Sequence, residues 1–192
     1  MALQRDKIIV VDIEATCWNV EPPPDGQLNE IIEIGMCMYD VENDDITDKR
    51  SIFVKPVASV VSEFCTQLTT ITQKQVDEHG IDFAEACDIL VNEYNTRKIL
   101  WTSWGGYDHK MFRKQCRRMG VSYPFGDKHM NLKKAFADYH HGNRMGMTRA
   151  LNKAELELVG THHRGDDDAW NIARLMQYLI QEYDMDFIKR YW

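Results

Sequence analysis

Apolar, β-branched residues gather into short runs in the first third of the chain, and these runs predict strands. Lys7 to Ile13 is typical of a central strand that is buried on both faces. Glu30 to Tyr39 and Asp48 to Val54 predict two more strands, joined by an acidic turn at Glu42 to Asp45. Three prolines and an Asp-Gly pair within Glu21 to Gln27 predict a loop, because proline ends both helices and ladders. The first third therefore predicts a three-stranded meander.

Helical spacing dominates the rest of the chain. An N-cap at Thr72 predicts a short helix that ends near Gly80, and a longer helix is expected over Phe83 to Tyr94. A fourth strand, Ile99 to Trp104, precedes a basic amphipathic helix over Asp108 to Met119. The remaining predicted helices are Leu132 to His140, Arg149 to Val159 and Asp167 to about Gln181. This order predicts an α/β fold in which helices flank a mixed sheet.

Length and composition fit one domain that spans residues 1–192. The chain is 44% hydrophobic and 28% charged, which is ordinary for a globular domain of 192 residues. No apolar run approaches the roughly 18 residues of a membrane span, and Met1 to Asp12 lacks the layout of a signal peptide. The five cysteines show no paired C-x-x-C spacing, which favours reduced thiols over disulfides or a zinc site. We therefore expect a cytoplasmic protein with no membrane partner.

The net charge of −7 conceals a basic segment. Between His109 and Lys153 there are eleven basic and two acidic residues, so this segment carries +9 and the remainder −16. Phe112 and Met119 are expected to face inward from the first helix of the segment. Four basic residues share its other side at helical spacing: Lys110, Lys114, Arg117 and Arg118. A basic track is typical of proteins that bind single-stranded nucleic acid, although a charge run is more often only a solvated face.

Asp12 and Glu14 stand at the end of the first predicted strand. Because side chains alternate along a strand, both carboxylates project from the same face. Charges at the end of a strand buried on both faces are costly unless they are used, and two adjacent carboxylates repel unless a cation joins them. Asp-x-Glu alone is expected about once by chance in a chain of this composition, so the location carries the argument.

Further carboxylates occupy two later positions. Asp108 follows the fourth predicted strand, and a run of three aspartates ending at Asp168 opens the last helix. Helix capping is the alternative role for both, because acids at a helix start accept free backbone N–H groups. His163 lies five residues before Asp168, and His162 lies five before Asp167. Four oxygen ligands suit Mg²⁺ or Mn²⁺, and one neutral histidine suits a general base.

Three segments of the chain carry a known pattern: Asp12 to Cys17 (DIEATC), Trp104 to Asp108 (WGGYD) and His163 to Ala169 (HRGDDDA). They resemble the three motifs of the DEDDh branch of the DnaQ-like 3′–5′ exonucleases. Phe64 to Asp77 (FCTQLTTITQKQVD) more narrowly resembles the Eri-type exoribonucleases, a subfamily that includes KapD-like bacterial members. The resemblance covers about Lys7 to Ile180 and implies a ribonuclease H-like fold with a five-stranded mixed sheet.

The resemblance also implies a mechanism. The carboxylates that would hold two Mg²⁺ or Mn²⁺ ions are Asp12, Glu14, Asp108 and Asp168. Two such ions lie about 3.5–4 Å apart and clamp an in-line displacement. His163 would deprotonate the attacking water, and a 5′-mononucleotide would leave the 3′ end. We choose His163 over His162 because it is the histidine that pairs with Asp168 in the family spacing.

Four residues are expected to contact the substrate: Thr16, Leu68, Trp104 and Lys110. The resemblance implies the first three as the pocket of the terminal nucleotide, with core packing as the alternative for Leu68 and Trp104. Lys110 belongs to the basic segment. The chain departs from the family pattern at Thr70, where a glycine is usual, and at Gly165, where many members have alanine.

Single-stranded 3′ ends are the expected partner, with RNA favoured over DNA. Three alternatives stay open: an exonuclease directed at DNA, a phosphodiesterase for small oligonucleotides, and a non-catalytic module that only binds nucleic acid. The four carboxylates count against the last alternative, because clustered anions repel a phosphate backbone. The sequence identifies no protein partner.

Overall fold

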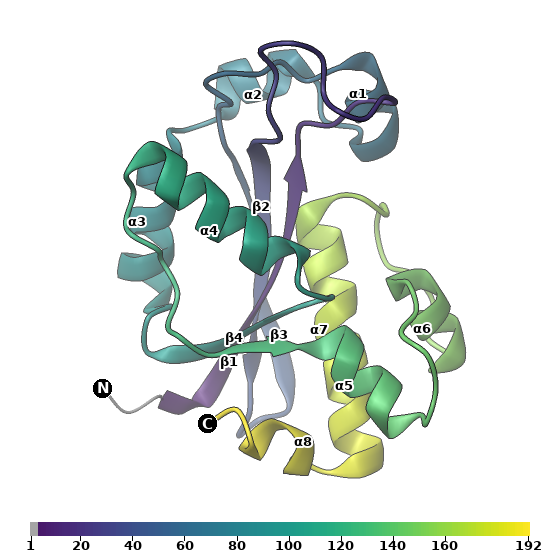
Figure 1. Ribbon diagram of the computed structural model, residues 1–192. Coiled ribbons are helices and arrows are strands. Elements are labelled where there is room, and N and C mark those ends of the chain that lie inside the picture. The colour runs from purple at the N-terminus through teal and green to yellow at the C-terminus, as the bar shows by residue number, and fades with distance from the viewer. Residues whose placement is uncertain (1–3) are drawn as a thin grey trace.

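The apolar runs of the first third form the centre of the sheet in the computed structural model, which describes residues 4–192. The sheet has five strands: β1 (Gln4–Ala15), β2 (Ile31–Asp40), β3 (Asp45–Phe53), β4 (Ile99–Ser103) and β5 (His129–Asn131). Their order is β3-β2-β1-β4-β5 (Figure 1). The first three pair antiparallel as the predicted meander, whereas β4 and β5 add parallel strands beyond β1. The predicted mixed five-stranded sheet is therefore confirmed.

Side chains of β1 alternate between two cores. Ile8 and Val10 enter one core, whereas the odd-numbered apolar residues of the strand enter the other. Asp12 and Glu14 continue the even-numbered series at the end of the strand, where the core gives way to a pocket. The two carboxylates therefore lie on the same face of the sheet as Ile8 and Val10, because side chains alternate between the two faces along the strand.

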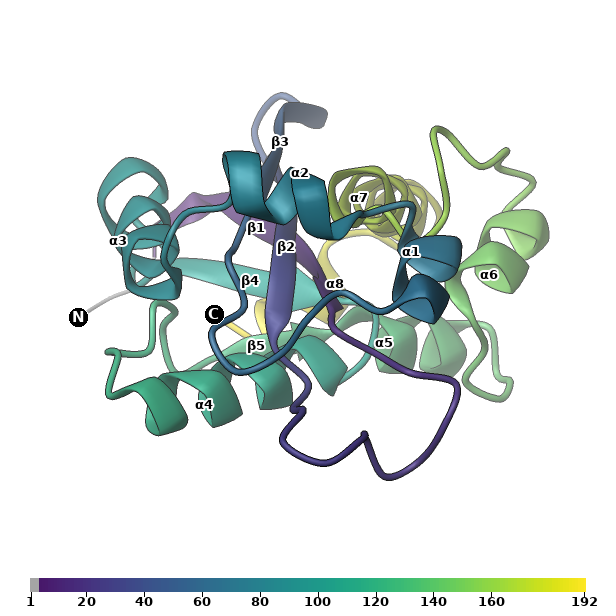
Figure 2. The same ribbon diagram turned by 90° about the horizontal axis from the view of Figure 1, so that it is seen from above.

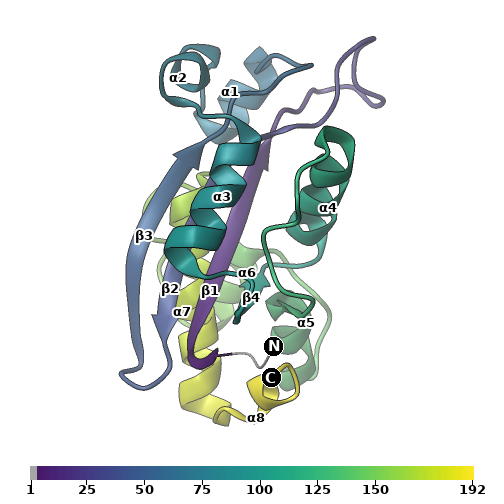
Figure 3. The same cartoon turned by 90° about the vertical axis from the view of Figure 1, so that its left-hand side faces the viewer.

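Helices cover both faces of the sheet (Figures 2 and 3). Two pack against one face: α3 (Phe83–Tyr94) and α4 (Tyr107–Met119). The other face is covered by α5 (Leu132–Tyr139), α6 (Met147–Lys153), α7 (Gly165–Tyr183) and α8 (Asp186–Lys189). A third, smaller core lies under α1 (Glu63–Thr69) and α2 (Gln73–His79), which sit over the end of β1 in Figure 1.

Several elements differ from the sequence-based expectation. The strand β5 and the helices α1 and α8 were not predicted, because elements of three, seven and four residues are too short to show a period. The predicted helix Arg149 to Val159 is wrong at its end, since α6 stops at Lys153 and Glu155 adopts a left-handed φ of 56°. α7 is longer than expected by two residues at each end.

The cysteines are free thiols, as expected for a chain without a disulfide framework. Four are buried and Cys17 is half-buried. Among residues 4–192, no helix combines the length and the apolar character that crossing a membrane requires.

Candidate active site

The end of β1 opens into a pocket with a volume of about 350 Å³. Its walls come from β1, from the segment between β4 and α4, from the start of α6, and from the segment that leads into α7. All five residues with predicted chemical roles line it: Asp12, Glu14, Asp108, His163 and Asp168. The structure thus brings together groups that are far apart in the sequence.

The four carboxylates converge from two helices and one strand. Carboxylate oxygens of Asp12, Glu14 and Asp168 lie within 4.8 Å of one another. Asp108 stands in the first turn of α4 and accepts a hydrogen bond from the backbone N–H of Ile13, at 3.2 Å. This contact holds its carboxylate against β1, between the two acids of that strand. Capping is not the role of Asp108, because the N-cap of α4 is the preceding glycine, Gly106.

A close approach of backbones positions the start of α7. Gly35 of β2 lies opposite Asp12 in the β1–β2 ladder. A Cβ on Gly35 would lie 1.7 Å from the carbonyl carbon of Gly165, so only glycine allows this crossing. At Gly165 an added Cβ would lie 2.9 Å from the nitrogen of Gly35, which is also too close without a shift. The glycine at position 165, where many family members have alanine, thus fits the tight contact in this chain.

Glu33 anchors the same crossing, and the sequence analysis missed it. It is fully buried and lies opposite Glu14 in the β1–β2 ladder. Its carboxylate accepts hydrogen bonds from the Ser51 hydroxyl at 2.6 Å, from Arg164 Nη2 at 2.9 Å and from the Gly165 N–H at 2.8 Å. No local pattern signals this role, because Arg164 is 131 positions away in the sequence.

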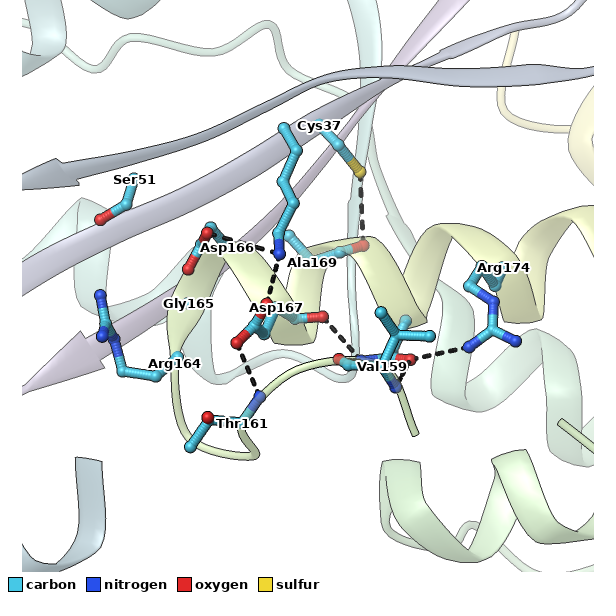
Figure 4. A network of polar contacts seen from close by, with 12 residues as sticks. Cys37, Ser51, Val159, Thr161, Arg164, Gly165, Asp166, Asp167, Ala169 and Arg174 are labelled. Carbon is cyan, nitrogen blue, oxygen red and sulfur yellow. Dashed lines mark hydrogen bonds and ion pairs between the residues drawn. The ribbon is translucent and has the colours of Figure 1, made fainter. Parts of the chain in front are cut away.

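The other acids at the start of α7 point away from the pocket. Asp167 accepts a hydrogen bond from the Thr161 N–H at 2.7 Å and pairs with Lys49 of β3, while Asp166 lies 3.6 Å from the same ammonium group (Figure 4). Of the three consecutive aspartates, Asp168 alone lines the pocket. The capping alternative therefore does not describe Asp168, whose partners are the two histidines.

Two histidines flank Asp168. His162 Nδ1 lies 3.0 Å from Asp168 Oδ2, and the backbone N–H of His163 donates to the same oxygen at 3.0 Å. The two imidazole rings stack with centroids 3.9 Å apart, and both line the pocket. His163 adopts a φ of 65°, a left-handed conformation that is uncommon for residues other than glycine. Burial and the neighbouring His162 lower the pKa of His163, so its imidazole is neutral at neutral pH.

Burial is the main reason why the pKa values of all four pocket carboxylates are raised. Burial raises the pKa of Glu14 to about 9, and the charge of Asp168 adds to this effect. The pKa of Asp12 lies well above its usual value because of burial and the nearby Asp108 and Asp168. Burial also raises the pKa values of Asp108 and Asp168. A divalent cation would relieve this repulsion, and an all-oxygen donor set fits Mg²⁺ or Mn²⁺.

Trp104 is the expected substrate residue that lines the pocket. Its ring is half-buried and packs edge-on against Phe136, with centroids 5.8 Å apart. Its indole N–H donates to the backbone carbonyl of Met145 at 3.1 Å, which fixes the orientation of the ring. The Trp104 side chain therefore packs against the core and also lines the pocket.

The other expected substrate residues lie outside the lining of this pocket. Thr16 is fully buried, and its hydroxyl donates to the Leu28 carbonyl at 2.8 Å and accepts from the Glu30 N–H at 2.9 Å. Through these two hydrogen bonds the Thr16 hydroxyl joins the start of the loop after β1 to its end, next to β2. Leu68 is 39% exposed on α1, which excludes the core alternative, and Lys110 is exposed one turn into α4.

Tyr107 and Met147 also line the pocket, and no sequence pattern pointed to them. Tyr107 is 54% exposed, in the motif that carries Asp108. The phenolic hydroxyl of Tyr107 is protonated at neutral pH and can donate a hydrogen bond. The pocket therefore has aromatic and thioether walls beside its acidic floor.

The helix α4 carries the expected basic side, with one exception. Phe112 is buried and Met119 is half-buried against the same core. Arg118 Nη2, however, lies 2.9 Å from Glu30, a nearly fully buried carboxylate, so this guanidinium is committed to an internal ion pair. The other cations of this side are Lys110, Lys114 and Arg117, and all three are exposed.

Known proteins resemble this chain in both sequence and fold. A family model for exonucleases, of the RNase T type, matches residues 9–176. The 3′-5′ exoribonuclease 1 of Rattus norvegicus is 33% identical over 189 residues, which cover 92% of this chain and 54% of that protein. The probable 3′-5′ exonuclease KapD of Bacillus subtilis is 26% identical, over 94% of this chain and 87% of that protein. The chain spans about half the length of the rat relative.

Solved structures agree with these matches. The nuclease domain of 3′hExo, a DEDDh family member bound to rAMP, superposes with a TM-score of 0.84 at 28% identity, over 95% of this chain and 96% of that chain. A 3′-exonuclease in a structure of 3′-end recognition of a histone mRNA stem-loop gives a TM-score of 0.81 at 28% identity, over 95% of this chain and 66% of that one. The family match, the ordered carboxylates and the ribonuclease H-like sheet show that the chain belongs to the exonuclease family, in its DEDDh branch.

Proposed function

We propose that the chain is a divalent-metal-dependent 3′–5′ exonuclease that hydrolyses single-stranded or 3′-overhanging RNA to 5′-mononucleotides. One observation carries the proposal: carboxylates of Asp12, Glu14 and Asp168 converge within 4.8 Å, with Asp108 held against the same strand and a neutral His163 at the pocket wall. Membership of the exonuclease family supports the same reaction class.

In this proposal two Mg²⁺ or Mn²⁺ ions are held by the pocket's four acids: Asp12, Glu14, Asp108 and Asp168. Bound ions of this kind make water nucleophilic at neutral pH and stabilise the charge on the departing oxygen. The raised pKa values of Asp12 and Glu14 support the assignment, because burial and the neighbouring acids both disfavour their charged forms and a bound cation would favour them.

His163 acts as the general base and accepts the proton of the attacking water. Its lowered pKa keeps the imidazole able to accept a proton at neutral pH. The two residues that follow it, Arg164 and Gly165, are bonded to the buried Glu33, so the sheet positions the imidazole more firmly than a free loop would. The product leaves without a covalent intermediate on the protein.

The terminal nucleotide binds against Trp104, Tyr107 and Met147, whose apolar and aromatic surfaces suit a base and a sugar. Leu68 and Lys110 contribute from outside the pocket lining, Lys110 by attraction to phosphate, while Thr16 acts through the loop that it holds. The preference for RNA is supported by relatives named as exoribonucleases and by neighbours with rAMP or an RNA stem-loop. A single domain over residues 1–192 and a cytoplasmic location remain predictions of the sequence.

The test is a time course on 3′-tailed single-stranded RNA and DNA of matched sequence, with Mn²⁺, Mg²⁺ or excess chelator, that resolves every product length. We expect stepwise shortening from the 3′ end only with metal, faster on RNA, and none with Asp168→Asn. Binding without shortening would favour the non-catalytic module. Faster turnover of a dinucleotide than of a long strand would favour the small-oligonucleotide phosphodiesterase.

A further inference from the structure

Hydrogen bonds connect Asp108 to two residues that do not line the candidate active site, Ser103 and His129. Ser103 is the last residue of β4, which leads into α4, and His129 is the first residue of β5 (Figure 1). The Ser103 side chain is fully buried, and its hydroxyl oxygen lies 2.9 Å from His129 Nε2. The same hydroxyl group hydrogen-bonds to the carboxylate of Asp108. Neither Ser103 nor His129 has a role in the function proposed above.

The direction of these hydrogen bonds follows from the protons that each group can donate. A hydroxyl group donates one proton, and an ionised carboxylate only accepts, so the Ser103 hydroxyl donates to Asp108 when Asp108 is ionised as a metal ligand. The other nearby acceptor, the Gly105 carbonyl, is uncharged and lies 3.4 Å from the Ser103 oxygen, beyond the usual range of about 2.5–3.0 Å. Because the Ser103 proton is used for Asp108, His129 Nε2 is the donor in its contact with the Ser103 oxygen.

The surroundings of His129 fix its charge and its orientation. Burial and the neighbouring His109 lower its pKa to about 4, so the ring is neutral at neutral pH and carries a single N–H. The ring centroid lies 4.3 Å from that of the buried Trp101 and 5.1 Å from that of His109, to which the His129 ring is nearly parallel. Arg113 Nε donates to His109 Nε2 at 2.8 Å and holds that ring in turn. These contacts restrict rotation of the His129 imidazole and keep Nε2 at Ser103.

Asp108 is thereby held from two strands of the sheet. Its carboxylate accepts one hydrogen bond from the Ile13 N–H of β1, at 3.2 Å, and another from the Ser103 hydroxyl of β4. Two fixed donors limit rotation of the carboxylate, which also lines the pocket. Hydrogen bonds of this kind orient the ligands of metal ions, and their loss typically costs about 10- to 100-fold in metal affinity or activity.

We propose that His129 and Ser103 are positioning residues for metal binding: His129 orients the Ser103 hydroxyl, and this hydroxyl orients the carboxylate of Asp108 toward the pocket. The inference rests on the proposed exonuclease function and specifies which residues outside the pocket make Asp108 an effective ligand. Neither residue lines the pocket, so both act through Asp108. The short strand β5 then serves to place His129 beside the end of β4.

The first test separates the N–H donor of His129 from its ring. His129→Gln supplies an amide N–H but loses the ring, whereas His129→Phe retains a ring and loses the donor. Isothermal titration of the full chain with Mn²⁺ compares both variants with Ser103→Ala. We expect Ser103→Ala and His129→Phe to weaken Mn²⁺ binding by about 10- to 100-fold, and His129→Gln to recover most of this loss. The reverse order of the two His129 variants would show a packing role and overturn the inference.

Two further comparisons separate positioning from folding. Because His129 acts through Ser103, adding His129→Phe to Ser103→Ala should lower Mn²⁺ affinity no further, whereas additive losses would overturn the order of the chain. Thr102→Val is the matched control: Thr102 is equally buried on β4, and its hydroxyl donates to the Met130 carbonyl of β5 at 2.8 Å. Side chains alternate along β4, so Thr102 faces away from Ser103, and its loss should leave Mn²⁺ affinity unchanged.

The position of the His129 proton is a separate readout that needs no catalysis. Long-range ¹H–¹⁵N correlation spectra of the protein with ¹⁵N-labelled histidine, recorded in saturating Mg²⁺, show which ring nitrogen carries the proton. His129→Phe identifies the signals by their loss. We expect the Nε2–H form. The Nδ1–H form would make Nε2 an acceptor of the Ser103 proton, leave Asp108 without this donor, and overturn the inference.

The outcomes distinguish this inference from the function on which it rests. An unmodified protein that neither binds Mn²⁺ nor hydrolyses RNA overturns the proposed function, and the inference with it. An unmodified protein that does both, beside a Ser103→Ala variant with unaltered Mn²⁺ affinity, overturns the inference alone. An equal loss of affinity in Thr102→Val shows that these hydroxyls act on the pairing of β4 with β5 rather than on Asp108, which overturns the inference as well.

Discussion

Gly35 and Gly165 meet backbone to backbone, and a Cβ on Gly35 would lie 1.7 Å from the carbonyl carbon of Gly165. Gly35 is the ladder partner of Asp12, and Gly165 precedes Asp168 by one helical turn. The contact therefore sets the separation of two carboxylates from opposite ends of the chain. A larger residue at either position would push α7 away from β2, and Asp168 with it.

Gly35→Ala is expected to lower the free energy of unfolding by about 3 kcal/mol or more. The added methyl group would overlap backbone atoms of α7, which cannot move aside as a flexible side chain could. It should also weaken Mn²⁺ binding. Urea denaturation and a calorimetric Mn²⁺ titration measure the two effects. Gly142→Ala is the matched control, because its Cβ meets nothing nearer than 3.6 Å. Equal denaturation midpoints for the two variants would contradict the role of the crossing.

Asp168→Asn is expected to abolish hydrolysis and to weaken Mn²⁺ binding, since it removes one of the charges that converge in the pocket. Asp166→Asn removes a charge from the same helical turn but faces Lys49, so it should retain both properties. Isothermal titration with Mn²⁺ compares the pair. The ligand assignment fails if both variants bind Mn²⁺ equally well.

The stability of the metal-free protein should fall as the pH rises. The pKa of Glu14 is about 9 in the folded protein, against an ordinary value of 4.5, so between these values the folded state holds a proton that the unfolded state releases. Stability falls with pH wherever the unfolded state binds fewer protons. We expect Tm in excess chelator to decrease from about pH 5 to pH 9, and Glu14→Gln to flatten the slope. A Tm that rises across this window would argue against the raised pKa.

His163→Ala is expected to lower kcat by about 10²-fold or more, the usual contribution of a general base, with little change in Mn²⁺ affinity. His162→Ala is the matched comparison, because its ring stacks on that of His163 and bonds to Asp168. We expect a smaller loss of kcat from His162→Ala. Single-turnover rates at saturating metal decide between them, and a larger loss from His162→Ala would assign the base to that residue.

Thr70→Gly is expected to stabilise the protein by about 1 kcal/mol. Thr70 closes α1 with a φ of 64°, a conformation that is strained for a β-branched residue and free for glycine. The chain therefore retains the backbone form that suits the family's usual glycine at this position. Thermal and urea unfolding measure the gain, and Thr70→Ala should gain less because its Cβ remains. No gain from glycine would mean that the loop relieves the strain elsewhere.

The strands at the centre of the sheet were predictable because burial on both faces leaves a local signature. β1, β2 and β4 follow runs of Ile, Val, Leu and Met that need no knowledge of partners. β5 has no such signature. It has only three residues, and its parallel pairing with β4 depends on the intervening helix α4 bringing the chain back to the sheet. The length of α6 was also hidden, because Leu156 and Leu158 continue the apolar pattern beyond the helix end.

The same distinction applies to the candidate site. Asp12 and Glu14 lie near the end of a strand, and Asp108 and Asp168 lie near the starts of helices. The ends of strands and helices can be predicted from the local sequence pattern. Glu33 and Gly35 lie inside an apolar strand, and their roles depend on ladder register and on the crossing of α7, neither of which leaves a local pattern. The contact of His162 with Asp168 was likewise out of reach, because it depends on the left-handed backbone at His163.

The order of the elements along the chain has a consequence for biosynthesis. Asp12 and Glu14 emerge early from the ribosome, whereas Asp168 belongs to the last long helix. Until α7 is released and packs against β2 through Gly165, a nascent chain carries an incomplete set of carboxylates. The candidate site is therefore complete only after α7 has been synthesised and has packed against β2.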